Sequence, residues 1–208
     1  MHIMKDIMVT HIRFMAGTLA IISWISLLLQ WILLRDRMDE PTNLVRARYF
    51  SYFTLISNIL VALCYSAWFV FPVMSVNQPT NATLLTAVCL YIIIVALVYH
   101  LILRKSGGLK GLHRLVSDFH HSWIPICYVL LWQCIVEPGI VKTLSTGYFL
   151  ILPILYLGYI LLLGSKTSQY PYPFVDVKAI GLGKVVRNCF LLTLIFALLG
   201  YLLILWKS

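Results

Sequence analysis

The feature that most constrains this sequence is a series of six apolar runs, each about as long as a membrane is thick. A helix needs about 20 apolar residues to cross the ~30 Å hydrocarbon core of a bilayer. Of the 208 residues, 61% are hydrophobic and 11% are charged, which leaves too little polar surface for a soluble protein. We therefore predict an all-α integral membrane protein, a six-transmembrane-helix bundle that forms a single polytopic membrane domain over residues 1–208. The predicted spans are about 14–34, 47–73, 82–103, 119–136, 146–164 and 188–206.

The distribution of basic residues between the predicted loops gives the orientation. Cytoplasmic loops of membrane proteins are enriched in lysine and arginine. Loops one, three and five hold 12 of the 16 basic residues, whereas loops two and four and both tails share the remaining four. This alternation supports six spans, with both termini outside. The 12 residues are Arg35, Arg37, Arg46, Arg48, Arg104, Lys105, Lys110, Arg114, Lys166, Lys178, Lys184 and Arg187.

The same loop residues account for the net charge of +9, so the charge does not indicate a nucleic-acid partner. The five cysteines lie inside apolar runs, with no CxxC pair and no histidine at ligand spacing. We expect them to be small buried side chains, and we expect neither a metal site nor an organic cofactor.

Two of the predicted spans carry polar side chains, which are costly in a membrane and usually face the interior of a helix bundle. In the second span, helical spacing puts Arg48, Ser51, Thr54 and Asn58 on one stripe. Hydrogen bonding between helices explains such a stripe as well as a functional site does. Ser51 and Asn58 are also candidate donors to an oxyanion.

The fourth span opens with two histidines. Asp118, His121, Pro125 and Tyr128 follow one another on one helical face, whereas His120 shares its face with apolar residues. We therefore expect His121 to point into the bundle and His120 to face lipid or the interface. Pro125 is expected to kink the helix and to free a backbone carbonyl near the site.

The two polar stripes are predicted to meet near the inner membrane surface. If both helices enter from the cytoplasmic side, Thr54 lies about 10 Å deep and His121 about 5 Å deep. A hydroxyl beside an imidazole is the pairing that activates a weak alcohol as a nucleophile. Asp118 or Asp176 would orient the ring.

The fifth loop contains a stiff segment on the same predicted side. Tyr170, Pro171, Tyr172, Pro173 and Phe174 alternate aromatic rings with prolines, which favours an extended backbone. The segment is either a rigid connector in the headgroup layer or a lid over the site.

Three parts of the sequence together resemble a known family. The aromatic-rich segment 48–54, the histidine before Pro125 and the tyrosine–proline segment 170–174 resemble the bacterial predicted-six-helix membrane proteins, which are similar to the androgen-induced protein family of eukaryotes. The resemblance covers essentially the whole chain in order and topology. It implies an intramembrane threonine hydrolase acting on fatty acid esters of hydroxy fatty acids.

Carried over residue by residue, the family's threonine falls on Thr54. Its histidine falls on His121 if the spacing to proline is four, and on His120 if it is five. We therefore predict a hydrolase whose substrate is a membrane lipid ester, in the bacterial inner membrane, with no protein partner implied. A small transporter or channel, and a non-enzymatic membrane partner protein, are the alternatives.

Overall fold

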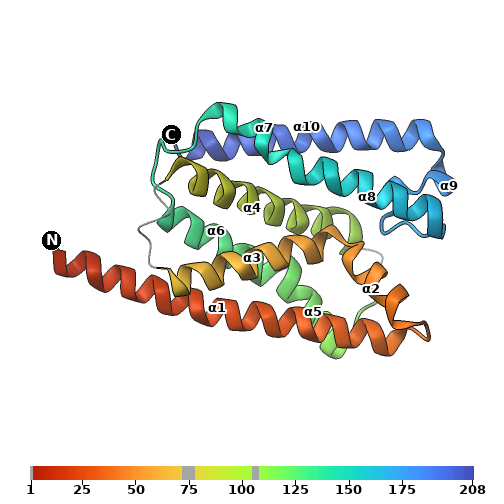
Figure 1. The fold of residues 1–208 in the computed structure, drawn as a ribbon, viewed down its shortest axis with the longest axis horizontal. Coiled ribbons are helices and arrows are strands. Elements are labelled where there is room, and N and C mark those ends of the chain that lie inside the picture. The colour runs from red at the N-terminus through yellow and green to blue at the C-terminus, as the bar shows by residue number, and fades with distance from the viewer. Residues whose placement is uncertain (1, 72–77, 105–107) are drawn as a thin grey trace. The chain divides into compact units, whose positions relative to one another are not determined.

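The computed structural model describes residues 2–71, 78–104 and 108–208 of the chain, and their regular structure is helical, with no strand (Figure 1). Lys105 and the last two residues of the predicted span 47–73 lie outside these residues. The chain divides into two compact units, Met1–Val141 and Lys142–Ser208, and each is described by itself below.

Five of the described helices are long and apolar enough to cross a membrane, as expected of an all-α membrane protein. The predicted run 119–136 is not among them, although it belongs to an unbroken helical stretch from Gly111 to Ile135. The first half of this stretch is polar, because it carries Arg114, Asp118 and three histidines, His113, His120 and His121. The five helices are Val9–Arg37, Phe53–Val70, Pro79–Leu103, Thr143–Thr167 and Leu182–Trp206.

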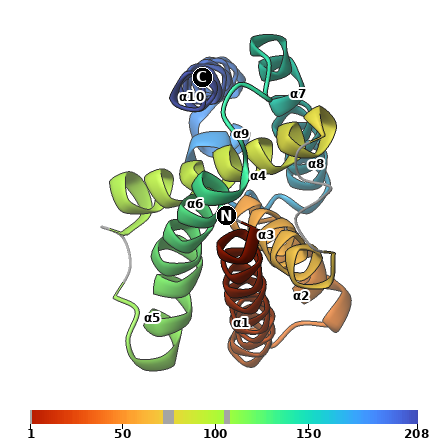
Figure 2. The same cartoon turned by 90° about the vertical axis from the view of Figure 1, so that its left-hand side faces the viewer.

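The first unit is built from four long helical stretches and a short connecting helix. Helices α1 and α3 lie side by side, α4 packs against α3 and α6, and the α5–η4–α6 stretch packs against α1 and α3 (Figures 1 and 2). Two of its segments, η2 and η4, are π-helical turns. The elements are α1 (His2–Arg37), α2 (Thr42–Phe50), α3 (Phe53–Val70), α4 (Pro79–Val98), η2 (Tyr99–Leu103), α5 (Gly111–Asp118), η4 (Phe119–Trp123) and α6 (Ile124–Ile135).

Helix α1 presents a stripe of small residues to its neighbours and large apolar residues outward. Ala16, Ala20 and Ser23 follow one another at spacings of four and three, and all are buried. Small side chains let two helix backbones approach closely, which is how helices associate in lipid. The opposite face exposes Ile21 and Leu28 by 62% and 58%, which suits contact with lipid and not with water.

A cluster of aromatic residues fixes α3, α4 and α6 relative to one another. The rings of Trp68 and Tyr128 stack with centroids 5.4 Å apart, and Tyr65 packs against both. The indole N–H of Trp132 donates to the Thr86 hydroxyl (3.0 Å), so the buried polar atoms of this cluster are paired. Tyr128, predicted to share the polar stripe of the site, belongs to this cluster and donates to the Leu85 carbonyl.

The second unit is a pair of long helices joined by the tyrosine–proline loop. Its elements are η5 (Thr143–Ser145), α7 (Thr146–Phe149), α8 (Ile151–Thr167), η6 (Pro173–Val175), α9 (Val177–Ile180) and α10 (Leu182–Trp206). The loop is held at both ends. The ring of Tyr170 lies directly over Gly164 of α8, and the Asn188 amide of α10 donates to the Phe174 carbonyl (3.0 Å).

The close approach of Tyr170 makes Gly164 sensitive to substitution. A methyl group added at Gly164 would lie against the Tyr170 ring, so we expect Gly164→Ala to cost about 1–3 kcal/mol and to lower the melting temperature in detergent. Gly158→Ala on the same helix is the matched control, because nothing lies within 4 Å of its added methyl. Alanine is also the better helix former, so Gly158→Ala is expected to be neutral or stabilising. Equal melting temperatures for the two variants would contradict the contact.

Candidate active site

Thr54 lies in the first turn of α3, because the helix predicted over 47–73 is broken after Phe50. Tyr52 has an extended backbone (φ −91°, ψ 121°) and α3 begins at Phe53. Both the amide and the hydroxyl of Ser51 donate to the Arg48 carbonyl, at 3.2 and 2.7 Å, which closes α2. The prediction of one continuous polar stripe was therefore wrong, since Arg48 belongs to α2 while Thr54 and Asn58 belong to α3. The depth of about 10 Å estimated for Thr54 assumed that continuous helix and loses its basis for the same reason.

His121 lies in a π-turn that Pro125 favours. Proline has no backbone N–H, so the carbonyl four residues before it loses its usual helical donor. That carbonyl belongs to His121, within η4, where the helix is widened and the amide of Ile124 donates to the carbonyl of Phe119, five residues earlier. Single π-turns of this kind are often found at functional sites.

The side chains of Thr54 and His121 meet between α3 and η4. Thr54 Oγ1 and His121 Nε2 are 3.5 Å apart, and both residues are half-buried. This separation is long for a hydrogen bond, but hydroxyl–imidazole pairs in known enzymes commonly tighten when substrate binds. The structure thus brings together the two residues that the sequence paired.

The other ring nitrogen of His121 fixes the tautomer. Nδ1 lies 2.8 Å from the Ser117 carbonyl oxygen, one helical turn earlier. A carbonyl only accepts, so Nδ1 carries the proton and donates it. In the neutral ring Nε2 is then an unprotonated acceptor, directed at the Thr54 hydroxyl. The orienting contact that was predicted for Asp118 or Asp176 is made by this backbone carbonyl.

His120 also points inward, contrary to the prediction that it faces lipid or the interface. Its side chain is 2% exposed, and its Nε2 lies 2.9 Å from the Ser26 hydroxyl of α1. The prediction assumed 100° of rotation per residue along a regular α-helix. A π-turn rotates less per residue, so both neighbouring histidines face the protein interior, one toward α1 and the other toward α3.

Asn58 links the backbones on the two sides of the Thr54–His121 pair. Its Nδ2 donates to the Thr54 carbonyl (2.8 Å) and to the His120 carbonyl (3.2 Å). Both amide protons are therefore used, and Asn58 has no donor left for an oxyanion. Its Oδ1 is buried without a hydrogen-bond partner.

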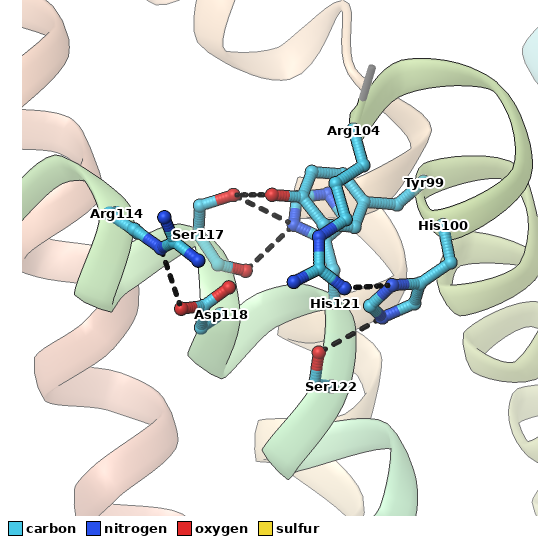
Figure 3. Close-up of polar contacts among 8 residues, drawn as sticks. All are labelled: Tyr99, His100, Arg104, Arg114, Ser117, Asp118, His121 and Ser122. Atoms are coloured by element: carbon cyan, nitrogen blue, oxygen red, sulfur yellow. Dashed lines mark hydrogen bonds and ion pairs between the residues drawn. The ribbon is translucent and has the colours of Figure 1, made fainter. Parts of the chain in front are cut away.

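A second group of polar contacts lies beside the pair, on η2 and its continuation (Figure 3). The Tyr99 ring stacks on the His121 ring, with centroids 3.9 Å apart and 14° between the planes. Arg104 donates to Nδ1 of His100 (3.3 Å), so Nε2 of His100 carries the proton that is shared with the Ser122 hydroxyl (3.0 Å). None of these contacts was predicted, because no periodicity in the sequence aligns η2 with η4.

The remaining predicted residues of the first unit lie around the pair without joining it. Asp118 is 3.7 Å from Arg114, one turn earlier on its own helix (Figure 3). Arg48 donates to the Met38 sulfur, and the Ser51 hydroxyl donates to the Arg48 carbonyl at the end of α2. Pro125 is buried in α6 and contributes through the π-turn that precedes it.

The remaining predicted residues of the second unit have local roles there. Asp176 accepts hydrogen bonds from the amides of Lys178 and Ala179, both at 3.0 Å, and so caps α9. The rings of Tyr172 and Phe174 stack with centroids 5.1 Å apart, which stiffens the segment on both sides of Pro173.

The chain matches no protein-family model, and comparisons with curated proteins and with solved structures find no significant match. The site geometry and the residue pattern are therefore what indicate its chemistry.

Proposed function

We propose that the protein is an intramembrane hydrolase that cleaves a lipid ester with Thr54 as nucleophile and His121 as general base. The observation that carries the proposal is the tautomer of His121. With Nδ1 donating to the Ser117 carbonyl, the lone pair of Nε2 faces the Thr54 hydroxyl at 3.5 Å. This is the arrangement that nucleophilic catalysis by an alcohol requires, with a base next to the hydroxyl and a third group that orients the base.

The reaction would proceed in two steps, acylation of Thr54 and hydrolysis of the acyl–threonine ester. Thr54 Oγ1 attacks the acyl carbonyl while its proton passes to Nε2 of His121. The tetrahedral intermediate collapses, and the leaving alcohol takes that proton, which leaves an acyl–threonine ester. Water then attacks this ester, gives its proton to Nε2, and releases the fatty acid and Thr54 with its proton restored.

The start of α3 supplies a donor for the oxyanion. The amide N–H of Thr54 lies in the first helical turn, where the helix itself offers no acceptor. The helix dipole also favours negative charge at this end. The Ser51 hydroxyl and the Asn58 amide already donate to backbone carbonyls, so the Thr54 amide is the donor proposed for the oxyanion.

The proposed membrane arrangement has six spans, both termini outside and the site near the cytoplasmic surface of the bacterial inner membrane. The half-polar stretch from Gly111 to Ile135 would be the fourth span along the chain. Together with the five apolar helices it would make six. Arg104 and Arg114 lie near His121 (Figure 3), and Arg48 precedes Thr54 by six residues, which supports a cytoplasmic position for the site. The resemblance to the androgen-induced protein family supports a fatty acid ester of a hydroxy fatty acid as substrate.

The direct test is labelling of the purified protein with a fluorophosphonate probe for activated serine and threonine hydroxyls. We expect wild type and Thr54→Ser to be labelled and Thr54→Ala to remain unlabelled. Thr193→Ala is the matched control, because the hydroxyl of Thr193 bonds only to a carbonyl of its own helix, Cys189 O at 2.9 Å. Labelling that persists in Thr54→Ala, or a folded wild type that neither labels nor hydrolyses a lipid ester, would overturn the proposal. Substrate flux without product would then favour a transporter.

A further inference from the structure

The two π-turns of the first unit face each other and make contact through consecutive residues. Tyr99 and His100 begin η2, and their partners His121 and Ser122 are adjacent in η4 (Figure 3). A π-turn is an uncommon local structure, and two of them in contact at the base of a nucleophile–base pair indicate a shared role.

The ring of Tyr99 covers one face of the His121 imidazole. The two rings are nearly parallel, with centroids 3.9 Å apart. The hydroxyl of Tyr99 accepts a hydrogen bond from Ser117 Oγ (3.1 Å), and Ser117 also holds His121 through its carbonyl. The imidazole is therefore held in its plane by Tyr99 and at its Nδ1 edge by Ser117, so Nε2 has one direction in which to point.

We propose that Tyr99 is a positioning residue of the hydrolase, which aligns His121 and stabilises the imidazolium that forms when Thr54 is deprotonated. The inference rests on the proposed function. The face of a phenol ring attracts a cation, and the attraction is stronger where water is excluded. Because His121 is neutral before attack and charged during it, the stack favours the transition state over the ground state, which is the condition for raising kcat.

The charged groups around His121 do not replace this contact. On its own helix, Arg114 and Asp118 pair with each other at 3.7 Å. On the facing helix, Arg104 donates to His100 at 3.3 Å, and His100 is joined to Ser122. Tyr99 is thus the aromatic face that a positively charged His121 ring meets.

Tyr99→Leu and Tyr99→Phe separate the face of the ring from its hydroxyl. We expect kcat of Tyr99→Leu on a lipid ester to fall about 10- to 30-fold with KM unchanged, because the stack acts on His121 during attack and not on substrate binding. Tyr99→Phe retains the ring face and loses only the bond from Ser117, so its kcat is expected to stay within about threefold of wild type. A rise in KM without loss of kcat, or equal losses in both variants, would overturn the inference.

A spectroscopic measurement tests the stack without relying on activity. In isotope-labelled protein the His121 ring protons, assigned by their absence in His121→Gln, should resonate upfield because they lie over the Tyr99 ring. The shift should remain in Tyr99→Phe and disappear in Tyr99→Leu. If no variant changes the shift, the stack is absent and the inference fails, whatever the enzyme does. If the shift behaves as expected but wild type shows no turnover above Thr54→Ala, the proposed function fails and the role of Tyr99 in catalysis fails with it.

Discussion

Replacing His121 by alanine is expected to lower the turnover of a lipid ester by about 10³-fold or more while leaving the protein folded. Removing the base from a nucleophile–base pair typically costs about as much as removing the nucleophile itself. Without Nε2 at 3.5 Å, the Thr54 hydroxyl has no acceptor for its proton when attack begins. Initial rates on a defined ester, measured in detergent with Thr54→Ala as background, give the value. His121→Gln should be equally inactive, because an amide fills similar space but takes no proton.

His120→Ala is the matched control on the neighbouring residue. Its imidazole is 2% exposed and pairs with Ser26, so truncation leaves a cavity and an unpaired hydroxyl in the packing against α1. We expect this variant to lose about 2–4 kcal/mol of stability and to retain the activation of Thr54 in the fraction that stays folded. If His120→Ala is folded and inactive while His121→Ala turns over, the roles of the two histidines are reversed.

Much of the first unit follows from residue patterns that are local. Apolar length predicted the long helices, and the surplus of polar residues at the start of two runs singled out Thr54 and His121. Their approach to 3.5 Å agrees with the argument that Thr54 and His121 lie toward the same end of their helices. Such inferences succeed because the cost of a polar group in a membrane leaves few places for it.

The parts that were missed depend on departures from regular helix geometry. A helical wheel places His120 and His121 on different faces, and only the π-turn at Phe119–Trp123 turns both inward. The break before Phe53 moves Thr54 from the middle of a helix to its first turn. Pro125 indicated an irregular helix, but not which irregular form the chain would adopt, and the break before Phe53 was not predicted.

Asn58→Asp is expected to destabilise the first unit by about 3–5 kcal/mol and to abolish hydrolysis. The side chain is fully buried, and both of its amide protons bond to backbone carbonyls, those of Thr54 and His120. The substitution keeps the shape of the side chain but directs a carboxylate at two carbonyl oxygens, with no cation to pair with it. The cross-link between α3 and η4 is lost, and Thr54 and His121 are no longer held within reach of each other. Chemical unfolding in mixed micelles gives the stability, and fluorophosphonate labelling reports on Thr54 in the same samples.

Asn188→Asp is the control that separates the loss of the cross-link between helices from the loss of a single hydrogen bond. The Asn188 amide donates to the Phe174 carbonyl at 3.0 Å, and the residue is half-buried on α10. Losing a single, partly solvated hydrogen bond typically costs about 1 kcal/mol, so this variant should remain folded and should still be labelled at Thr54. Equal destabilisation by the two substitutions would mean that Asn58 does not hold two helices together. A stable Asn58→Asp protein with full labelling would mean that the Thr54–His121 pair is held by packing alone.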